Sequence, residues 1–257
     1  MLDLKQIESF YPEQLKPFRK NLLREYLQYK ILETIFESSS AEKLTFMGGT
    51  CIHIVHGNPR FSEDLDFDNP GIDRNDFKTL SQMVKRNLTL QGYTVEIKNI
   101  FADAFRAYLR FPGLLHAAGI SGHWDEKLLI QIDTEPQEFE YKQDKFILNK
   151  FDVFSRINVV PVDILAAQKI CCIFSSRRPM GRDFFDAIFL LGKTDVNFDY
   201  LTQKLSIRNP AELREKLLWR CAQLDLSRLV KDLEPFVYSK RDLNRVLMFS
   251  DFVQQKL

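Results

Sequence analysis

Two aspartates, Asp64 and Asp66, are two residues apart in a segment where charged and apolar side chains alternate. That alternation predicts a β-strand, so both carboxylates leave the strand on the same face. Two carboxylates this close repel each other, and a divalent cation relieves the repulsion. Because Mg²⁺ commonly binds one or two carboxylates together with water and substrate phosphate, the pair predicts a Mg²⁺ site, with Mn²⁺ as the alternative. Asp133, on the polar side of a later predicted strand, can supply a third ligand for a two-metal site.

A short predicted strand over residues 44–47 leads directly into Gly48, Gly49 and Thr50. The two glycines allow the backbone to approach a phosphate closely, and Thr50 adds a hydroxyl. The helix predicted over residues 50–56 offers free N–H groups and the positive end of its dipole to an anion. A Gly-Gly pair alone is more often a turn, and an Asp-x-Asp pair alone is more often a solvated strand face. Their order along this chain favours a nucleotide-binding site.

Lys169 is the only charged residue between Asp163 and Arg177, within the apolar stripe of a predicted helix. A lone lysine in apolar surroundings costs free energy unless it has an anionic partner. Asp183 and Asp186 share one face of the next predicted helix, and either can be that partner. The alternative is a lysine that extends to solvent along its aliphatic stem. If Lys169 serves a bound nucleotide, Lys169→Met should be at least as stable as the native chain.

The elements that would position these residues fall into two parts. Up to about residue 160, helical and strand periodicities both occur, and from Pro161 onward the pattern is helical. Helices are predicted over residues 13–37, 50–56, 73–91, 161–174 and 182–191, and strands over residues 44–47, 64–68, 93–100, 105–111 and 127–134.

The segment from Gly48 to Phe67 reads G-G-T-x9-R-x-S-x-D-x-D-F. It resembles the signature of nucleotidyltransferase toxins of the AbiEii/AbiGii type, within the DNA polymerase β-like nucleotidyltransferase superfamily. A second match covers residues 157–195, where the family has a helix with an essential lysine and then an R-D-x-x-D helix. The sequence departs from the family at His53, where an arginine is common, and a neutral histidine binds phosphate less firmly than a guanidinium.

The resemblance implies an α+β fold, in which a nucleotidyltransferase fold with a mixed β-sheet flanked by helices precedes an α-helical C-terminal lobe. Residues 1–155 would form the nucleotidyltransferase-like domain, and residues 156–257 the lobe that completes the active-site cleft. The implied reaction is metal-dependent transfer of a nucleoside monophosphate from a nucleoside triphosphate to an acceptor hydroxyl, with release of pyrophosphate.

The resemblance and the spacing together give three sets of site residues. The catalytic candidates are Asp64, Asp66, Lys169, Asp183 and Asp186. The metal ligands would be Asp64, Asp66 and Asp133. The nucleotide-binding candidates are Gly48, Gly49, Thr50, Arg60, Ser62 and Arg182.

The family further implies the toxin of a type IV toxin–antitoxin or abortive-infection pair that modifies RNA, in particular the 3′ end of tRNA, with a separate antitoxin protein as partner. The basic loop over residues 175–182 suits a triphosphate or a substrate backbone, and the net charge of +4 over residues 201–257 suits RNA. Two alternatives remain open. One is a nucleotidyltransferase that acts on a small-molecule hydroxyl such as an antibiotic, and the other is a non-catalytic RNA-binding or protein-binding module.

Composition limits the partners and the compartment. The chain has 257 residues, 45% of them hydrophobic, and a net charge of +1, so nucleic acid would have to bind a local patch. The four cysteines lack a C-x-x-C spacing and are expected to be buried reduced thiols. With neither a signal-peptide core nor a membrane-length apolar stretch, the expected location is the cytoplasm, without membrane contact.

Overall fold

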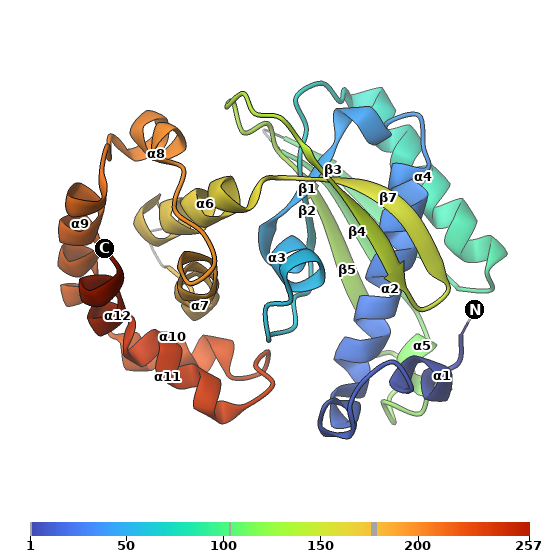
Figure 1. Ribbon diagram of the computed structural model, residues 1–257. Helices are drawn as coiled ribbons and strands as arrows, with labels where there is room; N and C mark the ends of the chain where they lie inside the picture. Colours follow the sequence, from blue (N-terminus) through green and yellow to red (C-terminus); the bar gives the residue numbers. More distant parts are fainter. Residues whose placement is uncertain (1, 103, 176–178) are drawn as a thin grey trace. The chain divides into compact units, whose positions relative to one another are not determined.

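The computed structural model describes residues 2–102, 104–175 and 179–257, which form two compact units (Figure 1). The first unit consists of Met1–Cys51 and Phe61–Val160, and the second of Ile52–Arg60 and Pro161–Leu257. The division expected at residue 155 assigned residues 52–60 to the first domain. The structure groups them with the second unit, because Asn58 and Arg60 bind side chains of that unit.

Within the described residues, the first unit contains a seven-stranded sheet in the order β3-β4-β5-β2-β1-β7-β6. The pairs β1–β7 and β2–β5 are parallel and the other pairs are antiparallel, so the predicted mixed sheet is confirmed. The strands are β1 (Thr45–Met47), β2 (Leu65–Asp68), β3 (Glu96–Phe101), β4 (Phe105–Phe111), β5 (Leu128–Thr134), β6 (Asp144–Lys150) and β7 (Val153–Val159).

One face of this sheet is apolar and covered by α2 (Arg19–Phe36) and α4 (Arg74–Leu90), which lie side by side in Figure 1. Phe36 of α2 packs on Phe67, and Phe77 of α4 packs on Phe105. Along β5 the alternate residues Leu128, Ile130 and Ile132 are buried on this face. Gln131 and Asp133 therefore point to the opposite, polar face, as the alternation predicted.

The β6–β7 hairpin was not predicted from the sequence. Its two strands are joined by a tight connection in which Phe151 has φ +59°, a left-handed conformation that usually belongs to glycine or asparagine. The remaining elements of this unit are α1 (Leu4–Glu8), the 3₁₀ helices η1 (Glu13–Phe18) and η2 (Ala41–Lys43), and α5 (Leu114–Ala117). Helix α3 (Gly48–His56) begins in the first unit and ends in the second.

The second unit is helical, as predicted. Helices α6 and α7 pack against each other, and α10, α11 and α12 contact α7. Gly181 at the start of α7 permits a close approach of α10, because a Cβ there would overlap the backbone carbonyl of Leu229. The elements are α6 (Val162–Ser175), α7 (Gly181–Leu191), α8 (Phe198–Leu205), α9 (Pro210–Ala222), α10 (Leu226–Leu233), η3 (Lys240–Leu243), α11 (Asn244–Leu247) and α12 (Phe249–Lys256).

Among the described residues, every helix is too short or too polar to cross a membrane. Cys51 and Cys221 are buried, as expected, but Cys172 is exposed and Cys171 is half-buried. The expectation of four buried thiols was therefore wrong for Cys172, which lies on a solvent-facing side of α6.

Candidate active site

A row of charged side chains crosses the polar face of the sheet in the first unit. Asp66 on β2 is paired in parallel register with Asp133 on β5, and Asp133 is paired in turn with Arg106 on β4. Neighbouring strands lie about 4.8 Å apart, so the two aspartates lie on adjacent strands of one surface. The sheet thus brings together two of the three predicted metal ligands, which are 67 residues apart in the chain.

The two oxygens of the Asp133 carboxylate contact different side chains. Gln131 Nε2 donates to its Oδ2 at 2.5 Å, and Arg106 Nε lies 3.4 Å from its Oδ1. Oδ1 is buried and accepts no hydrogen bond from any described residue. Burial raises the pKa of Asp133, against the lowering effects of Gln131 and Arg106. Asp133 is therefore a carboxylate with a ready acceptor atom and an increased affinity for protons.

Gly48 leads from β1 into α3 and lies against Asp66. Its φ is +77°, and a Cβ at this position would overlap the Asp66 carboxylate. Glycine is thus required here for its backbone conformation and for the space that it leaves. The Cys51 thiol, in the first turn of α3, has a pKa raised by burial and by Asp66, so it remains protonated.

The segment that leads into β2 is held by hydrogen bonds from two helices. The Thr50 hydroxyl, fully buried in α3, donates to the backbone carbonyl of Asp64. From α2, Gln28 Nε2 donates to the carbonyls of Ser62, at 3.1 Å, and Glu63, at 3.0 Å. The strand itself begins at Leu65, so Asp64 directly precedes it. These contacts give Thr50 a role in placing Asp64, in addition to the phosphate contact predicted from the sequence.

The residues present fit a Mg²⁺ ion that takes some of its ligands from the protein and the others from a substrate. Two adjacent carboxylates, one with a buried unbonded oxygen, match the preference of Mg²⁺ for one or two carboxylates plus phosphate and water. Within residues 2–102, 104–175 and 179–257, no group of three or more His, Cys, Asp or Glu side chains is arranged to hold a metal. The chain by itself therefore offers a partial coordination shell.

In the second unit, a buried network is centred on Asp186 of α7. Both oxygens of this carboxylate are occupied: Asn58 Nδ2 and Arg60 Nε donate to Oδ1 at 2.6 Å each, and Arg60 Nη2 donates to Oδ2 at 2.6 Å. Lys169 Nζ lies 3.0 Å from Oδ2. Arg60 and Asp186 are 1% and 0% exposed. The structure thus gives Arg60, a predicted nucleotide-binding residue, a bidentate carboxylate partner instead.

Lys169 pairs with both acids of the R-D-x-x-D helix, which confirms the predicted pairing. Its Nζ lies 3.3 Å from Asp183 Oδ1 and 3.0 Å from Asp186. Burial lowers the pKa of Lys169, but Asp186 and Asp183 outweigh it and raise the pKa above its usual value. Burial likewise raises the pKa of Asp186, and Arg60 and Lys169 outweigh it and hold that pKa below its usual value. Lys169 and Asp186 are therefore both charged at neutral pH.

The other positions that the sequence analysis named in this part of the chain have different surroundings. Asp183 is in the first turn of α7, where its Oδ2 also accepts from the Met180 N–H at 3.4 Å. Arg182 is half-buried and forms no ion pair or hydrogen bond with any described residue. Of the predicted basic loop, residues 176–178 lie outside the described part of the chain. His53 is nearly buried, with Nδ1 2.9 Å from the carbonyl oxygen of Asn58.

Sequence reasoning missed three residues of these two clusters. Asn58 and Gln28 are neutral amides that belong to no motif. Asn58 contacts a residue 128 positions away, and Gln28 contacts residues 34 and 35 positions away, so neither contact leaves a local signal in the sequence. Arg106 is an ordinary alternating residue of a predicted strand, and only the strand register shows that it faces Asp133.

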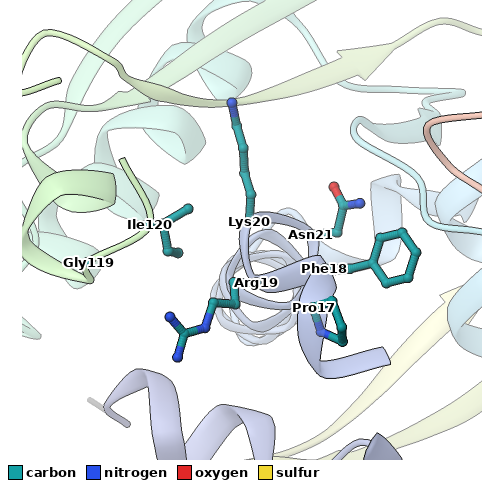
Figure 2. A pocket seen from close by; sticks show the side chains of 7 residues that line it. All are labelled: Pro17, Phe18, Arg19, Lys20, Asn21, Gly119 and Ile120. Atoms are coloured by element: carbon teal, nitrogen blue, oxygen red, sulfur yellow. The ribbon is translucent and has the colours of Figure 1, made fainter. Parts of the chain in front are cut away.

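A separate surface hollow lies at the start of α2 (Figure 2). Its two cations are already paired, Arg19 with Glu8 at 2.7 Å and Lys20 with Glu126 at 2.6 Å. None of the site residues predicted from the sequence contributes to it. The hollow is lined by Pro17, Phe18, Arg19, Lys20, Asn21, Gly119 and Ile120.

Comparison with known proteins gives a family and a fold. The model of the nucleotidyl transferase AbiEii toxin family, of type IV toxin–antitoxin systems, matches residues 30–254. The structure of JHP933 from Helicobacter pylori has a TM-score of 0.58 and 18% identity, over 91% of this chain and 90% of that chain. A candidate nucleotidyltransferase from H. pylori has the same TM-score and identity over 95% of each chain. No curated protein matches. The two structures share the fold, which confirms the predicted α+β class.

Proposed function

Because the chain belongs to the AbiEii family of nucleotidyltransferase toxins of type IV toxin–antitoxin systems, we propose that it transfers a nucleoside monophosphate to the 3′-terminal hydroxyl of an RNA, in particular a tRNA. The acceptor oxygen attacks the α-phosphorus and forms a new P–O bond. The bond from the α-phosphorus to the oxygen that bridges to the β-phosphate breaks, and pyrophosphate leaves. The observation that carries this proposal is the pairing of Asp66 with Asp133 beside Gly48.

We assign the metal to Asp64 and Asp66, with Asp133, the register partner of Asp66, as a third candidate ligand. Because no three such side chains of the described residues are arranged around one point, substrate phosphate and water would complete the shell. Mg²⁺ held by these carboxylates would neutralise charge on the triphosphate and polarise the α-phosphate. Gly48 and Gly49 bring backbone N–H groups at the start of α3 toward the phosphates, and Thr50 fixes Asp64 through its carbonyl. Asp133 is also the candidate to take the proton of the acceptor hydroxyl, because its Oδ1 has no hydrogen-bond donor among the described residues and its pKa is raised.

We assign to Lys169 the role of stabilising the negative charge that develops on the leaving pyrophosphate, because catalysis of phosphoryl transfer depends mainly on positioning and electrostatics. Asp183 and Asp186 orient Lys169. The saturated carboxylate of Asp186 supports a positioning role over proton transfer. The proposal includes a cytoplasmic location, because nucleoside triphosphates and tRNA occur there. It also includes a separately encoded antitoxin as the partner protein.

The test is label transfer from nucleoside triphosphates to total cellular RNA in the presence of Mg²⁺. Label at the α-phosphate should enter RNA, whereas label at the γ-phosphate should appear only in pyrophosphate, because the β- and γ-phosphates leave together. Periodate oxidation of the RNA, which destroys the terminal diol, should block transfer to the 3′ end. EDTA and Asp66→Asn should each abolish it. Label that enters only small molecules would favour a small-molecule acceptor, and no transfer to any acceptor would contradict the proposal.

A further inference from the structure

The polar face of the sheet continues beyond the carboxylates onto β4 and β3. Tyr108, on β4, the second strand from the β3 edge of the sheet, is paired with Gln131 on β5 and with Lys98 on β3. Arg106 and Arg110 lie two residues to either side of Tyr108, on the same face of β4. An aromatic ring is thus surrounded by three cations on one open surface. We call Lys98, Arg106, Tyr108 and Arg110 the sheet platform.

The side chains of the sheet platform are accessible, and two of its cations are without an anionic partner among the described residues. Lys98 and Arg106 are exposed, and Tyr108 and Arg110 are half-buried. Lys98 and Arg110 form no ion pair within that part of the chain. The Arg110 guanidinium lies 5.9 Å from the centre of the Tyr108 ring, which keeps it beside the ring. Cations that form no ion pair within the described residues are available to bind phosphate.

The sheet platform adjoins the proposed acceptor side of the site. Arg106 and Asp133 are directly paired, and Tyr108 is therefore the diagonal cross-strand neighbour of Asp133. Diagonal neighbours of this kind lie about 7–8 Å apart. A base stacked on the Tyr108 ring would accordingly bring the ribose of the same nucleotide toward Asp133, which is the residue assigned above to the acceptor hydroxyl.

We propose that the sheet platform binds the single-stranded 3′ end of the acceptor RNA, with its terminal base stacked on Tyr108 and its phosphates on Lys98 and Arg110. This rests on the proposed function and deepens it by naming the surface that selects the acceptor. Single-stranded RNA is held by this combination of an aromatic ring with a cationic surface. The acid on the same face of β3, Glu96, lies opposite Arg110 in the strand register and forms its ion pair with Lys127 at 2.8 Å.

The experiment measures the affinity of the purified full chain for a short, fluorescently labelled single-stranded RNA, and separately for ATP. Tyr108→Ala should weaken RNA binding about tenfold, and Tyr108→Phe should bind as the native chain does, because base stacking needs only the ring. Lys98→Gln/Arg110→Gln should weaken RNA binding and make it less salt-dependent. The slope of the logarithm of the binding constant against the logarithm of the salt concentration should fall in magnitude by about 0.7 for each phosphate that is no longer neutralised. ATP binding should change less than twofold in all three.

Two controls match these variants in kind. Lys78→Gln/Arg86→Gln removes two exposed charges from α4, which covers the other face of the sheet. Phe154→Ala removes an exposed aromatic ring from β7 of the same sheet. Both should bind RNA as tightly as the native chain. Thermal melts verify that each variant is folded.

The proposal is overturned if the native chain does not bind the RNA, or if the platform variants bind it as tightly as the native chain does. It is also overturned if the controls lose as much affinity as the platform variants, or if the platform variants lose ATP affinity in parallel. These outcomes are distinct from failure of the proposed function. A chain that binds RNA through Tyr108 but transfers no label would refute nucleotidyl transfer to RNA and leave the platform standing.

Discussion

Gly48 lies so close to Asp66 that a Cβ atom at position 48 would come within 2.7 Å of the Asp66 Cγ. Gly48→Ala therefore has to displace the carboxylate assigned to the metal, and it also places a side chain at φ +77°. We expect transfer to fall by at least about 10²-fold, because a shift of about 1 Å at a reacting group costs that much. Label transfer and thermal melts measure the two effects separately.

Gly57 provides the matched control, because its φ is +75° and a Cβ there would meet no atom within 4 Å. Gly57→Ala should cost about 1–2 kcal/mol of stability for the left-handed backbone alone and should retain transfer at temperatures well below its melting point. Equal losses of activity in the two alanine variants would show that backbone strain, and not displacement of Asp66, is responsible.

Thr50 should matter for stability even without nucleotide, because its hydroxyl donates to the Asp64 carbonyl. Thr50→Val keeps the shape of the side chain but removes the donor, and we expect a loss of about 1 kcal/mol together with reduced transfer. Thr50→Ser keeps the donor and should approach native behaviour. A Thr50→Val protein that melts like the native chain, yet binds ATP more weakly, would favour a direct phosphate contact instead.

The Arg60–Asp186 pair should stabilise the second unit in a pH-dependent way. Asp186→Asn removes the buried carboxylate that pairs with both Arg60 and Lys169 and leaves Lys169 with Asp183, and breaking such a pair costs roughly 3–5 kcal/mol. Because the pKa of Asp186 is below its usual value when folded, its contribution is complete above the ordinary pKa of about 3.9 and disappears as the pH falls through the lower folded value. Melting temperatures of the native chain and Asp186→Asn should therefore converge in acid.

A double variant separates positioning from proton transfer by Asp186. Arg60→Met/Asp186→Leu removes both charges and leaves Lys169 with Asp183, so stability should largely return. If Asp186 only positions its neighbours, measurable transfer should return too, with the native dependence on pH. The surface pair Lys240 and Glu234, 2.7 Å apart, serves as control, since Lys240→Gln/Glu234→Gln should behave like the native chain. A double variant that is folded but inactive would show that Arg60 or Asp186 is needed for transfer beyond its contribution to stability.

Local patterns explain why the sheet site could be predicted. The alternation around Asp64 and Asp66, and that around Gln131 and Asp133, needs only the two-residue period of a strand, which is visible in the sequence. The pairing of Asp66 with Asp133 needs the register of β2 against β5, for which the sequence holds no local signal. The position of each carboxylate on its strand was thus predictable, while the contact between the strands was a hypothesis.

Long-range contacts explain what was missed. The R-x-S-x-D-x-D motif predicts a nucleotide contact for Arg60, whereas its observed partner Asp186 is 126 residues away. The β6–β7 hairpin lacks the Asn-Gly or Asp-Gly pair that marks such turns, because Phe151 occupies the left-handed position. In both cases tertiary packing decides the structure, and the residue types near the position do not.

Lys169 is the position at which the structure reverses an expectation. The sequence suggests that Lys169→Met would be at least as stable as the native chain, because a costly buried charge is removed. Since Lys169 neutralises Asp183 and Asp186, its loss leaves two buried carboxylates with only Arg60, and we now expect a loss of roughly 3 kcal/mol. The pKa of Lys169 is raised, so this contribution is constant from neutral pH up to its ordinary pKa of about 10.4 and declines only above it.

Charge compensation can show whether Lys169 also acts on the substrate. Lys169→Met/Asp183→Asn removes one charge of each sign and leaves the Arg60–Asp186 pair intact, so its melting temperature should return toward the native value. Transfer should nevertheless remain roughly 10²–10³-fold below native, as expected when a donor that stabilises developing charge is removed. Label transfer and melts on the same preparation give both values. A double variant that regains both stability and transfer would reduce Lys169 to a structural partner of the two aspartates, and the charge on the leaving pyrophosphate would have to be met by another cation.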